Sequence, residues 1–364
     1  AWFLDSSGFR KWLRGTVYRE FGCGITDQTL STILATLQAI AQHEGDEVRV
    51  HVRCAREGMA YVIDRSAEDW SAIRVCATGC EIILRPPSLL VRTTNMRPLP
   101  VSVADGNINK LWKHINVPER CRLPLLAWLL DSLRPDTPYP VLELTGEQGS
   151  AKSSTQRRLR ALIDPNKVPL RGRPKTVEDI YVAAANNYVV SFENLSHLTP
   201  EQQDAFCTLS TGGGFATRQF YTNGEEHVLE AKRPVILNGI NPVATQPDLI
   251  ERTISIELPT IPADARRDEQ TLDAEWEADY PAILAGLLDL FAKALAKLPE
   301  IQLAAKQRMA DYQMLGEAIA QVLGHPAGHF SGLYEQITGE GIERGLETYG
   351  ITNAMQVFMY RRKE

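Results

Sequence analysis

The chain has 364 residues, of which 44% are hydrophobic and 23% charged, and its formal net charge is −6. This length allows two or three domains, and the composition is that of a folded protein rather than a disordered one. The acidic balance argues against a protein that coats nucleic acid, although a ring that holds DNA in a central channel needs positive charge only locally. No apolar run is long enough to span a membrane and no signal peptide is visible, so we expect a cytoplasmic protein. Because residue 1 is not methionine, we expect a piece of a longer protein.

Residues 1–105 are predicted to form a small α+β module. Apolar residues at helical spacing predict amphipathic helices over 6–21 and 26–45. The aromatic residues Trp2, Phe3, Phe9 and Trp12 could form a binding face, but we favour a place in the core. Short runs between turn residues then predict strands over 47–54, 59–64, 72–76, 81–84 and 89–92.

The six cysteines are scattered and form no C-x-x-C pair. Cys76 and Cys80 flank a predicted hairpin turn, and a zinc site completed by Cys54 is the alternative interpretation. Because the spacing is not that of known zinc sites, we favour reduced thiols without a metal.

A linker over 98–106 and a mainly helical apolar segment over 111–133 lead to the stretch that carries the chemistry. An alternating apolar run over 141–144 predicts a strand, and apolar residues at helical spacing over 156–163 predict a helix. Strand, loop and helix is the context in which the phosphate-binding pattern G-x-x-x-x-G-K-[ST], the P-loop, has meaning. The loop matches this pattern with one departure, Ala151 for glycine, and reads Gly146, Glu147, Gln148, Gly149, Ser150, Ala151, Lys152, Ser153.

The P-loop pattern has a physical basis. Backbone N–H groups around Gly149 and the start of the following helix can bind an anion. Lys152 would reach the β- and γ-phosphates, and the Ser153 hydroxyl would ligate Mg²⁺. Ala151 is compatible with this if its φ stays negative. The alternative is an ordinary strand-to-helix turn.

A second apolar strand over 188–192 ends in Glu193 and Asn194. A carboxylate at the end of a buried strand beside a P-loop can hold Mg²⁺ or its waters, so Glu193 is the predicted second metal ligand after Ser153. Asn194 stands where many such ATPases carry an acid that orients the attacking water. The alternative is a strand that ends in a polar turn. The basic loop over 164–175 is interpreted as a solvated surface loop, with a phosphate or subunit contact as the alternative.

A helix over 199–211 precedes a predicted β-hairpin over 215–232, because Asn223-Gly224 is a strong signal for a two-residue turn. Such a turn pairs Arg218 with Leu229 and puts Arg218 and His227 on one face. A buried strand over 234–239 carries Asn238, a short helix over 248–252 ends in Arg252, and a last strand covers 254–258. From residue 264 onward the pattern is helical, with later helices over 306–323 and 328–348.

In this order, the P-loop, Glu193, the hairpin, Asn238 and Arg252 resemble the ATPase core of AAA+ ring helicases, especially the superfamily-three and MCM-like branches and the viral primase–helicases. The core is also similar to ATP-binding proteins of phages and bacterial mobile elements. The resemblance covers 110–260 well and the helical tail loosely, and it says little about 1–105. It implies an α/β fold: a three-layer core with a parallel sheet over 106–260, preceded by the α+β module and followed by a helical lid region over 261–364.

The resemblance also assigns roles. It implies ATP and Mg²⁺ as cofactors, Glu193 and Asn194 at the catalytic centre, Asn238 as the sensor of the γ-phosphate or attacking water, and Arg252 as the arginine finger supplied to a neighbouring subunit. Because Ala151 and Asn194 depart from the family pattern, slow or partner-dependent hydrolysis is compatible with the sequence.

The resemblance implies an ATP-driven DNA translocase or helicase, a homo-oligomer of six subunits without a membrane partner. In such helicases the hairpin touches the nucleic-acid backbone. Because Glu225 and Glu226 would repel phosphates, Arg218 is the first expected contact and Lys232 the second; an ion pair of Arg218 with a neighbouring subunit is the alternative. The alternative function is an ATP-switched scaffold, loader or defence sensor. A third, a monomeric P-loop kinase, leaves Arg252 and the hairpin unexplained.

Overall fold

The computed structural model describes residues 1–101, 105–218 and 226–348. Its core is a four-stranded parallel sheet with the strand order β12-β7-β11-β8. Because all four strands run the same way, their carboxyl ends meet at one edge of the sheet, where the P-loop begins. The strands are β7 (Val141–Thr145), β8 (Val190–Leu195), β11 (Val235–Gly239) and β12 (Thr253–Glu257).

Strand β7 is buried along its whole length although its sequence alternates. Its one charged residue, Glu143, is buried and accepts hydrogen bonds from the backbone N–H groups of Val243 (2.7 Å) and Ala244 (3.1 Å) and from the Ser255 hydroxyl (2.9 Å). Burial raises the pKa of Glu143, and these donors oppose that rise. The carboxyl group thereby fixes the loop after β11 against the P-loop strand.

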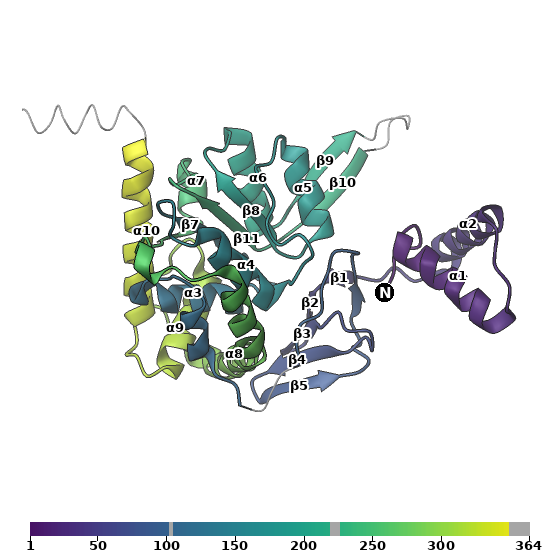
Figure 1. Cartoon of the computed structure of the whole chain (residues 1–364), viewed down its shortest axis with the longest axis horizontal. Coiled ribbons are helices and arrows are strands. Elements are labelled where there is room, and N and C mark those ends of the chain that lie inside the picture. Colours follow the sequence, from purple (N-terminus) through teal and green to yellow (C-terminus); the bar gives the residue numbers. More distant parts are fainter. Residues whose placement is uncertain (102–104, 219–225, 349–364) are drawn as a thin grey trace, which may run out of the picture.

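Helices cover both faces of the sheet (Figure 1). Leu142 and Leu144 of β7 belong to one apolar cluster, and Val141, on the opposite face, belongs to another. The first cluster is filled by α3 (Glu119–Asp131), α4 (Lys152–Ile163) and α8 (Glu269–Lys297), and the second by α5 (Val177–Asn186) and α6 (Pro200–Thr211). The predicted three-layer α/β core with a parallel sheet is confirmed.

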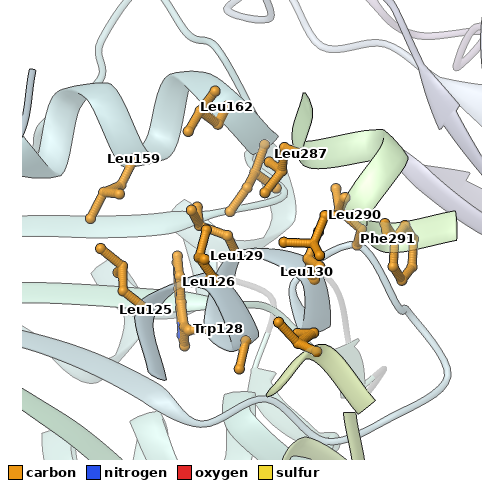
Figure 2. Close-up of a cluster of buried hydrophobic side chains, with 14 of the residues drawn as sticks. Leu125, Leu126, Trp128, Leu129, Leu130, Leu159, Leu162, Leu287, Leu290 and Phe291 are labelled. Atoms are coloured by element: carbon orange, nitrogen blue, oxygen red, sulfur yellow. The ribbon is translucent and has the colours of Figure 1, made fainter. Parts of the chain in front are cut away.

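The first cluster holds the helical layer together. Figure 2 shows the leucines and Trp128 of α3 next to Leu159 and Leu162 of α4 and to Leu287, Leu290 and Phe291 of α8. Full burial of such a side chain stabilises the fold by about 1.5–3 kcal/mol. The P-loop helix α4 is therefore anchored on a large, closely packed surface.

The remaining described elements after residue 105, apart from the hairpin, are helical, and the helical pattern expected from residue 264 onward is confirmed. They are η1 (Ile108–Lys113), α7 (Pro247–Ile250), η2 (Ala263–Ala265), η3 (Leu298–Glu300), α9 (Ala310–Val322) and α10 (His329–Thr348). Helix α9 packs on α3 and α8, and α10 packs on α9 and β12. None of the helices in the described ranges combines the length and apolar character that a bilayer span requires.

The N-terminal part contains two capped helices and a separate antiparallel sheet. The Ser6 and Thr26 side chains cap α1 (Ser7–Phe21) and α2 (Asp27–Glu44). The sheet order is β2-β3-β4-β5, and β1 pairs with β6 in parallel. These strands are β1 (Val50–Val52), β2 (Cys54–Glu57), β3 (Ala60–Asp64), β4 (Ala72–Cys76), β5 (Gly79–Ile83) and β6 (Leu89–Val91). The strand predicted over 47–54 is interrupted at Arg53, whose φ is 61°.

The prediction that the N-terminal aromatic residues lie in the core is wrong. Trp2, Phe3 and Trp12 are 37%, 53% and 47% exposed, and no residue of α1 is buried. Phe9 is half-buried and stacks on Trp12. Helices α1 and α2 lie beside the sheets rather than on them (Figure 1), so no third layer is present to enclose the rings.

One buried ion pair joins the N-terminal sheet to the P-loop helix. Arg53 and Asp164 are both fully buried, with 2.9 Å between Nη2 and Oδ1. Asp164 follows the last residue of α4 and also accepts hydrogen bonds from the backbone of Tyr188 and Val189. The loop predicted to be solvated over 164–175 therefore begins buried, and exposed positions start at Lys167.

Replacing Arg53 with methionine should destabilise the chain by about 3–5 kcal/mol, because it removes the nearer cation of a buried pair and leaves Asp164 only the longer contact with Arg160 at 3.6 Å. Denaturant unfolding measures this loss. The matched control is Arg56→Met, since the ion pair of Arg56 with Asp136 is partly exposed and should contribute about 1 kcal/mol or less. If the two variants lose the same free energy of unfolding, the buried pair contributes no more to stability than the partly exposed one.

Candidate functional site

The P-loop leaves β7 and enters α4 through a tightly constrained turn. Gly146 has a φ of 140°, and a Cβ there would lie 2.5 Å from the carbonyl oxygen of Leu258, so only glycine fits. The Ser150 hydroxyl donates to the Glu147 carbonyl (2.8 Å), and the Asn116 amide donates to the Ser150 carbonyl (3.0 Å). One hydrogen bond within the loop and one from Asn116, which follows η1, thus fix the conformation of the loop.

The backbone of Ala151 has a positive φ, whereas the sequence argument required a negative one. Its φ is 59° and its ψ is 31°, which is the left-handed conformation rather than a negative-φ one. The turn into α4 requires this geometry, and it overrides the preference of an alanine at a cost of about 1–2 kcal/mol. The alanine therefore occupies a position whose backbone favours the glycine of the usual pattern.

Lys152 is the first residue of α4, and its ammonium lies over the loop. It donates to the carbonyl oxygens of Gly146 (2.6 Å) and Glu147 (2.9 Å). Burial lowers the pKa of Lys152, and the nearby charge of Glu147 opposes this shift. Within the described residues the ammonium forms no ion pair, so its charge is available to an anion at the loop.

Ser153 and Glu193 meet at the site. The Ser153 hydroxyl donates to Oε2 of Glu193 over 2.8 Å, which joins the first turn of α4 to β8. A hydroxyl and a carboxylate are oxygen ligands of the kind that Mg²⁺ prefers. Among the described residues no group of three or more His, Cys, Asp or Glu could hold a metal ion, so the zinc alternative at Cys54, Cys76 and Cys80 has no support.

Asn194 and Asn238 are linked rather than separate. Asn194 has a φ of 54°, and its backbone N–H donates to Oδ1 of Asn238 over 2.9 Å. The Asn238 side chain is fully buried, and its amide nitrogen donates to Oε1 of Gln156. Both the oxygen and the nitrogen of the Asn238 side chain, the predicted sensor, thus already form hydrogen bonds within the chain.

Gln156 was missed by sequence reasoning. It is fully buried on α4, and its amide nitrogen lies 2.8 Å from the Ser191 hydroxyl and 3.0 Å from the Phe192 carbonyl. The available signal was a glutamine three residues after the P-loop serine, on the helix face that points at the strands. Its role is to fix α4 against β8 and β11.

Arg252, the predicted arginine finger, is engaged within its own chain. Its guanidinium forms a two-point contact with Asp248, at 3.1 and 3.2 Å, and its side chain is only 13% exposed. Asp248 also binds Arg308 at 2.6 Å. To reach a neighbouring subunit, Arg252 would have to leave this contact.

A second arginine lies directly at the P-loop. A Cβ placed on Gly149 would be 2.7 Å from Nη2 of Arg266, which also donates from Nε to the Ile261 carbonyl (3.3 Å). Beside it is a cavity of about 610 Å³. The cavity is bounded by the loop residues Gly149 and Ala151, by Trp112 and His114, and by Arg266 and Leu272. Sequence reasoning did not single out Arg266, because nothing local connects it to the loop.

The β-hairpin is present, but its predicted register is wrong. Strands β9 (Gly213–Arg218) and β10 (Glu226–Ala231) pair antiparallel, with Arg218 opposite Glu226 and Thr217 opposite His227. The predicted partner of Arg218 was Leu229, three positions away. Because three is an odd number, the argument that placed Arg218 and His227 on one face fails. The predicted Asn223-Gly224 turn and Glu225 lie outside the described residues.

The comparisons with known proteins give one family. The sequence matches the family described as actinomycete integrative conjugative element replication protein over residues 108–327, which is more than half of the chain. No curated protein sequence matches it. Among solved structures, the apo A form of the NrS-1 C-terminal region is 11% identical over 74% of this chain and 70% of that chain, with a TM-score of 0.38. The X-ray structure of JCV helicase is 13% identical over 64% and 70%, with a TM-score of 0.26.

Replacing Ala151 with glycine should stabilise the chain by up to about 1 kcal/mol. Glycine removes the left-handed strain of about 1–2 kcal/mol from the folded state. It also raises the conformational entropy of the unfolded chain, which offsets roughly 0.4–1 kcal/mol of that gain. The control is Ala161→Gly in the same helix, which should cost about 1 kcal/mol or more. Thermal and denaturant unfolding measure the stability of the two variants. If both are less stable than the wild type by a similar free energy of unfolding, the strain argument is contradicted.

Proposed function

Because the chain belongs to the family of actinomycete integrative conjugative element replication proteins, we propose that it is an ATP-hydrolysing motor that moves on DNA during replication of such an element. The motor would work as a homo-oligomeric ring of six subunits. The observation that carries this proposal is the contact between Ser153 and Glu193 beside Lys152. It brings together the hydroxyl, the carboxylate and the ammonium that phosphoryl transfer requires.

Each group would have a separate task. A triphosphate at the backbone N–H groups of the loop would draw the Lys152 ammonium from the loop carbonyls, exchanging neutral acceptors for charged ones. Ser153 and Glu193 would hold Mg²⁺, which neutralises phosphate charge when bound. The nucleoside would enter the cavity between Trp112 and Leu272, which opens onto Gly149 and Ala151.

The water that attacks the γ-phosphate would be oriented by Asn194. An amide can position a water but cannot take its proton as a carboxylate does, so hydrolysis is expected to be slow without further help. Arg266 would supply positive charge from the same subunit, since it lies against Gly149. Arg252 would supply it from a neighbouring subunit after release from Asp248.

A second candidate function is an ATP-switched scaffold or loader, whose nucleotide state controls assembly. Two observations favour it: the amide at Asn194 in place of an acid, and the two-point contact that holds Arg252 within its own chain. A switch would bind ATP and assemble, with little turnover.

Lys152→Ala should lower ATP hydrolysis by about 10²–10³-fold, the loss typical of removing one group that stabilises transition-state charge. Stability should change little, because the ammonium bonds only within its own loop. Steady-state phosphate release measures the rate, and circular dichroism checks the fold. Lys293→Ala, a change at an exposed lysine on α8, serves as the control. Equal turnover in the Lys152→Ala variant and the wild type would remove the nucleotide-site assignment.

Arg266→Ala and Arg252→Ala should both impair hydrolysis, but only one should be rescued by mixing with Lys152→Ala subunits. In the mixture with Arg252→Ala, a subunit with an intact P-loop receives Arg252 from its neighbour, so activity partly returns. In the mixture with Arg266→Ala, every site lacks either Lys152 or Arg266, so none returns. Rescue of Arg266→Ala would show that Arg266 acts between subunits, and failure to rescue Arg252→Ala would count against the ring.

A further inference from the structure

A second cavity lies at the base of the hairpin, away from the P-loop. It has a volume of about 600 Å³ and is bounded by β1, by the end of α6 at Thr211, and by Gly213 and Ala231 at the root of the hairpin. Arg49 comes from the N-terminal part, and Lys232 and Arg233 come from the core. We call it the hairpin-base pocket.

The charge of the hairpin-base pocket is one-sided. Arg49, Lys232 and Arg233 line it together with His51, and none of the described residues that line it is acidic. Arg49, Lys232 and Arg233 form no ion pair within the described chain. Asp136, Asp131 and Asp311 act on Lys232 only at longer range, and Asp136 is already bound to Arg56.

Arg233 is held in place without being neutralised, and Lys232 lies beside an aromatic ring rather than a carboxylate. Arg233 donates from Nε to the carbonyl oxygens of Ala184 (2.9 Å) and Asn187 (3.1 Å), which fixes its guanidinium. The Lys232 ammonium lies 5.9 Å from the ring centre of Tyr139. Burial lowers the pKa of both Lys232 and Arg233, as expected for positive charge without a partner. An anion in the pocket would offset this desolvation.

We propose that the hairpin-base pocket binds backbone phosphates of single-stranded DNA. A positively charged groove that follows the backbone is how proteins hold single strands without reading their sequence. The cations come from two parts of the chain, which suits successive phosphates of a polymer. None of the described residues that line the pocket belongs to the first turn of a helix, unlike the P-loop, which would hold a free triphosphate. Sequence reasoning singled out Lys232 as a hairpin residue; the pocket adds Arg49 and Arg233.

This inference rests on the proposed function, because the ligand is the DNA on which the motor would move. The test is binding of a fluorescein-labelled oligodeoxythymidylate to the full chain, measured by anisotropy over a range of salt concentrations. Each lost phosphate contact lowers the slope of log K against log salt by about 0.7 for a single strand. We expect this loss for Lys232→Gln, and about twice that loss for the double variant with Arg49→Gln.

Two further variants keep the result interpretable. Arg49→Glu changes an exposed residue outside the strands, so the fold is not at risk, and it should weaken binding more than Arg49→Gln does. Arg74→Gln on β4 removes a partly exposed cation that pairs with Glu81, away from the pocket, and should leave the salt slope unchanged. Melting curves of all variants check that they are folded.

ATP hydrolysis by the wild-type chain, measured without DNA, reports separately on the proposed motor. If the wild type hydrolyses ATP and binds the oligonucleotide but the pocket variants keep the wild-type slope, the pocket proposal is overturned and the motor stands. If the wild type hydrolyses no ATP but the salt slopes of the variants are lower than that of the wild type by the expected amounts, the pocket is supported and the motor fails. Absence of oligonucleotide binding by the wild type overturns the pocket. If the pocket variants bind thymidine monophosphate more weakly than the wild type but bind the oligonucleotide equally well, the pocket is a free-phosphate site. That result also overturns the proposal.

Discussion

The hydrogen bonds of Gln156 determine how the P-loop helix sits on the sheet. Its amide nitrogen lies within hydrogen-bond distance of the Ser191 hydroxyl and the Phe192 carbonyl, and its oxygen accepts from Asn238. Phe192 directly precedes Glu193, and Gln156 lies three residues after Ser153. These bonds therefore set which residue of β8 faces the first turn of α4, and the meeting of Ser153 with Glu193 follows from that register. Because every partner is buried, an error in the register would leave several polar groups unpaired, at about 1–3 kcal/mol each.

Helix α4 is fixed at both ends by polar contacts as well as along its apolar face. Its first turn carries Lys152 and Ser153, and the residue after its last turn, Asp164, binds Arg53 of the N-terminal part. Backbone hydrogen bonds from Arg97 to the Pro165 carbonyl and from Lys167 to the Asn95 carbonyl strengthen this connection between α4 and the N-terminal part. The chain as a whole carries a net charge of −6, so any contact with DNA depends on local concentrations of positive charge.

Local sequence signals predicted most of the elements, and long-range contacts explain what they missed. The helix that begins at Thr199 and the strand–loop–helix of the P-loop follow from patterns within a few residues. The conformation of Ala151 does not, because the whole turn imposes it. The hairpin register depended on an assumed two-residue turn, and the exposure of Trp2, Phe3 and Trp12 depended on where α1 lies. Arg266 reaches Gly149 over more than a hundred residues of sequence, and no local pattern records such a contact.

The central claim is that ATP hydrolysis at the P-loop is coupled to DNA. The most direct test is the steady-state rate of ATP hydrolysis by the wild-type chain in Mg²⁺, with and without single-stranded DNA, beside a mass measurement of the same samples with ATP. The account predicts slow hydrolysis by the protein alone, a clear rise in rate when single-stranded DNA is added, and a ring-sized mass with ATP. Hydrolysis that is absent, or that is the same with and without DNA while the protein assembles with ATP, would contradict a motor and leave the ATP-switched scaffold.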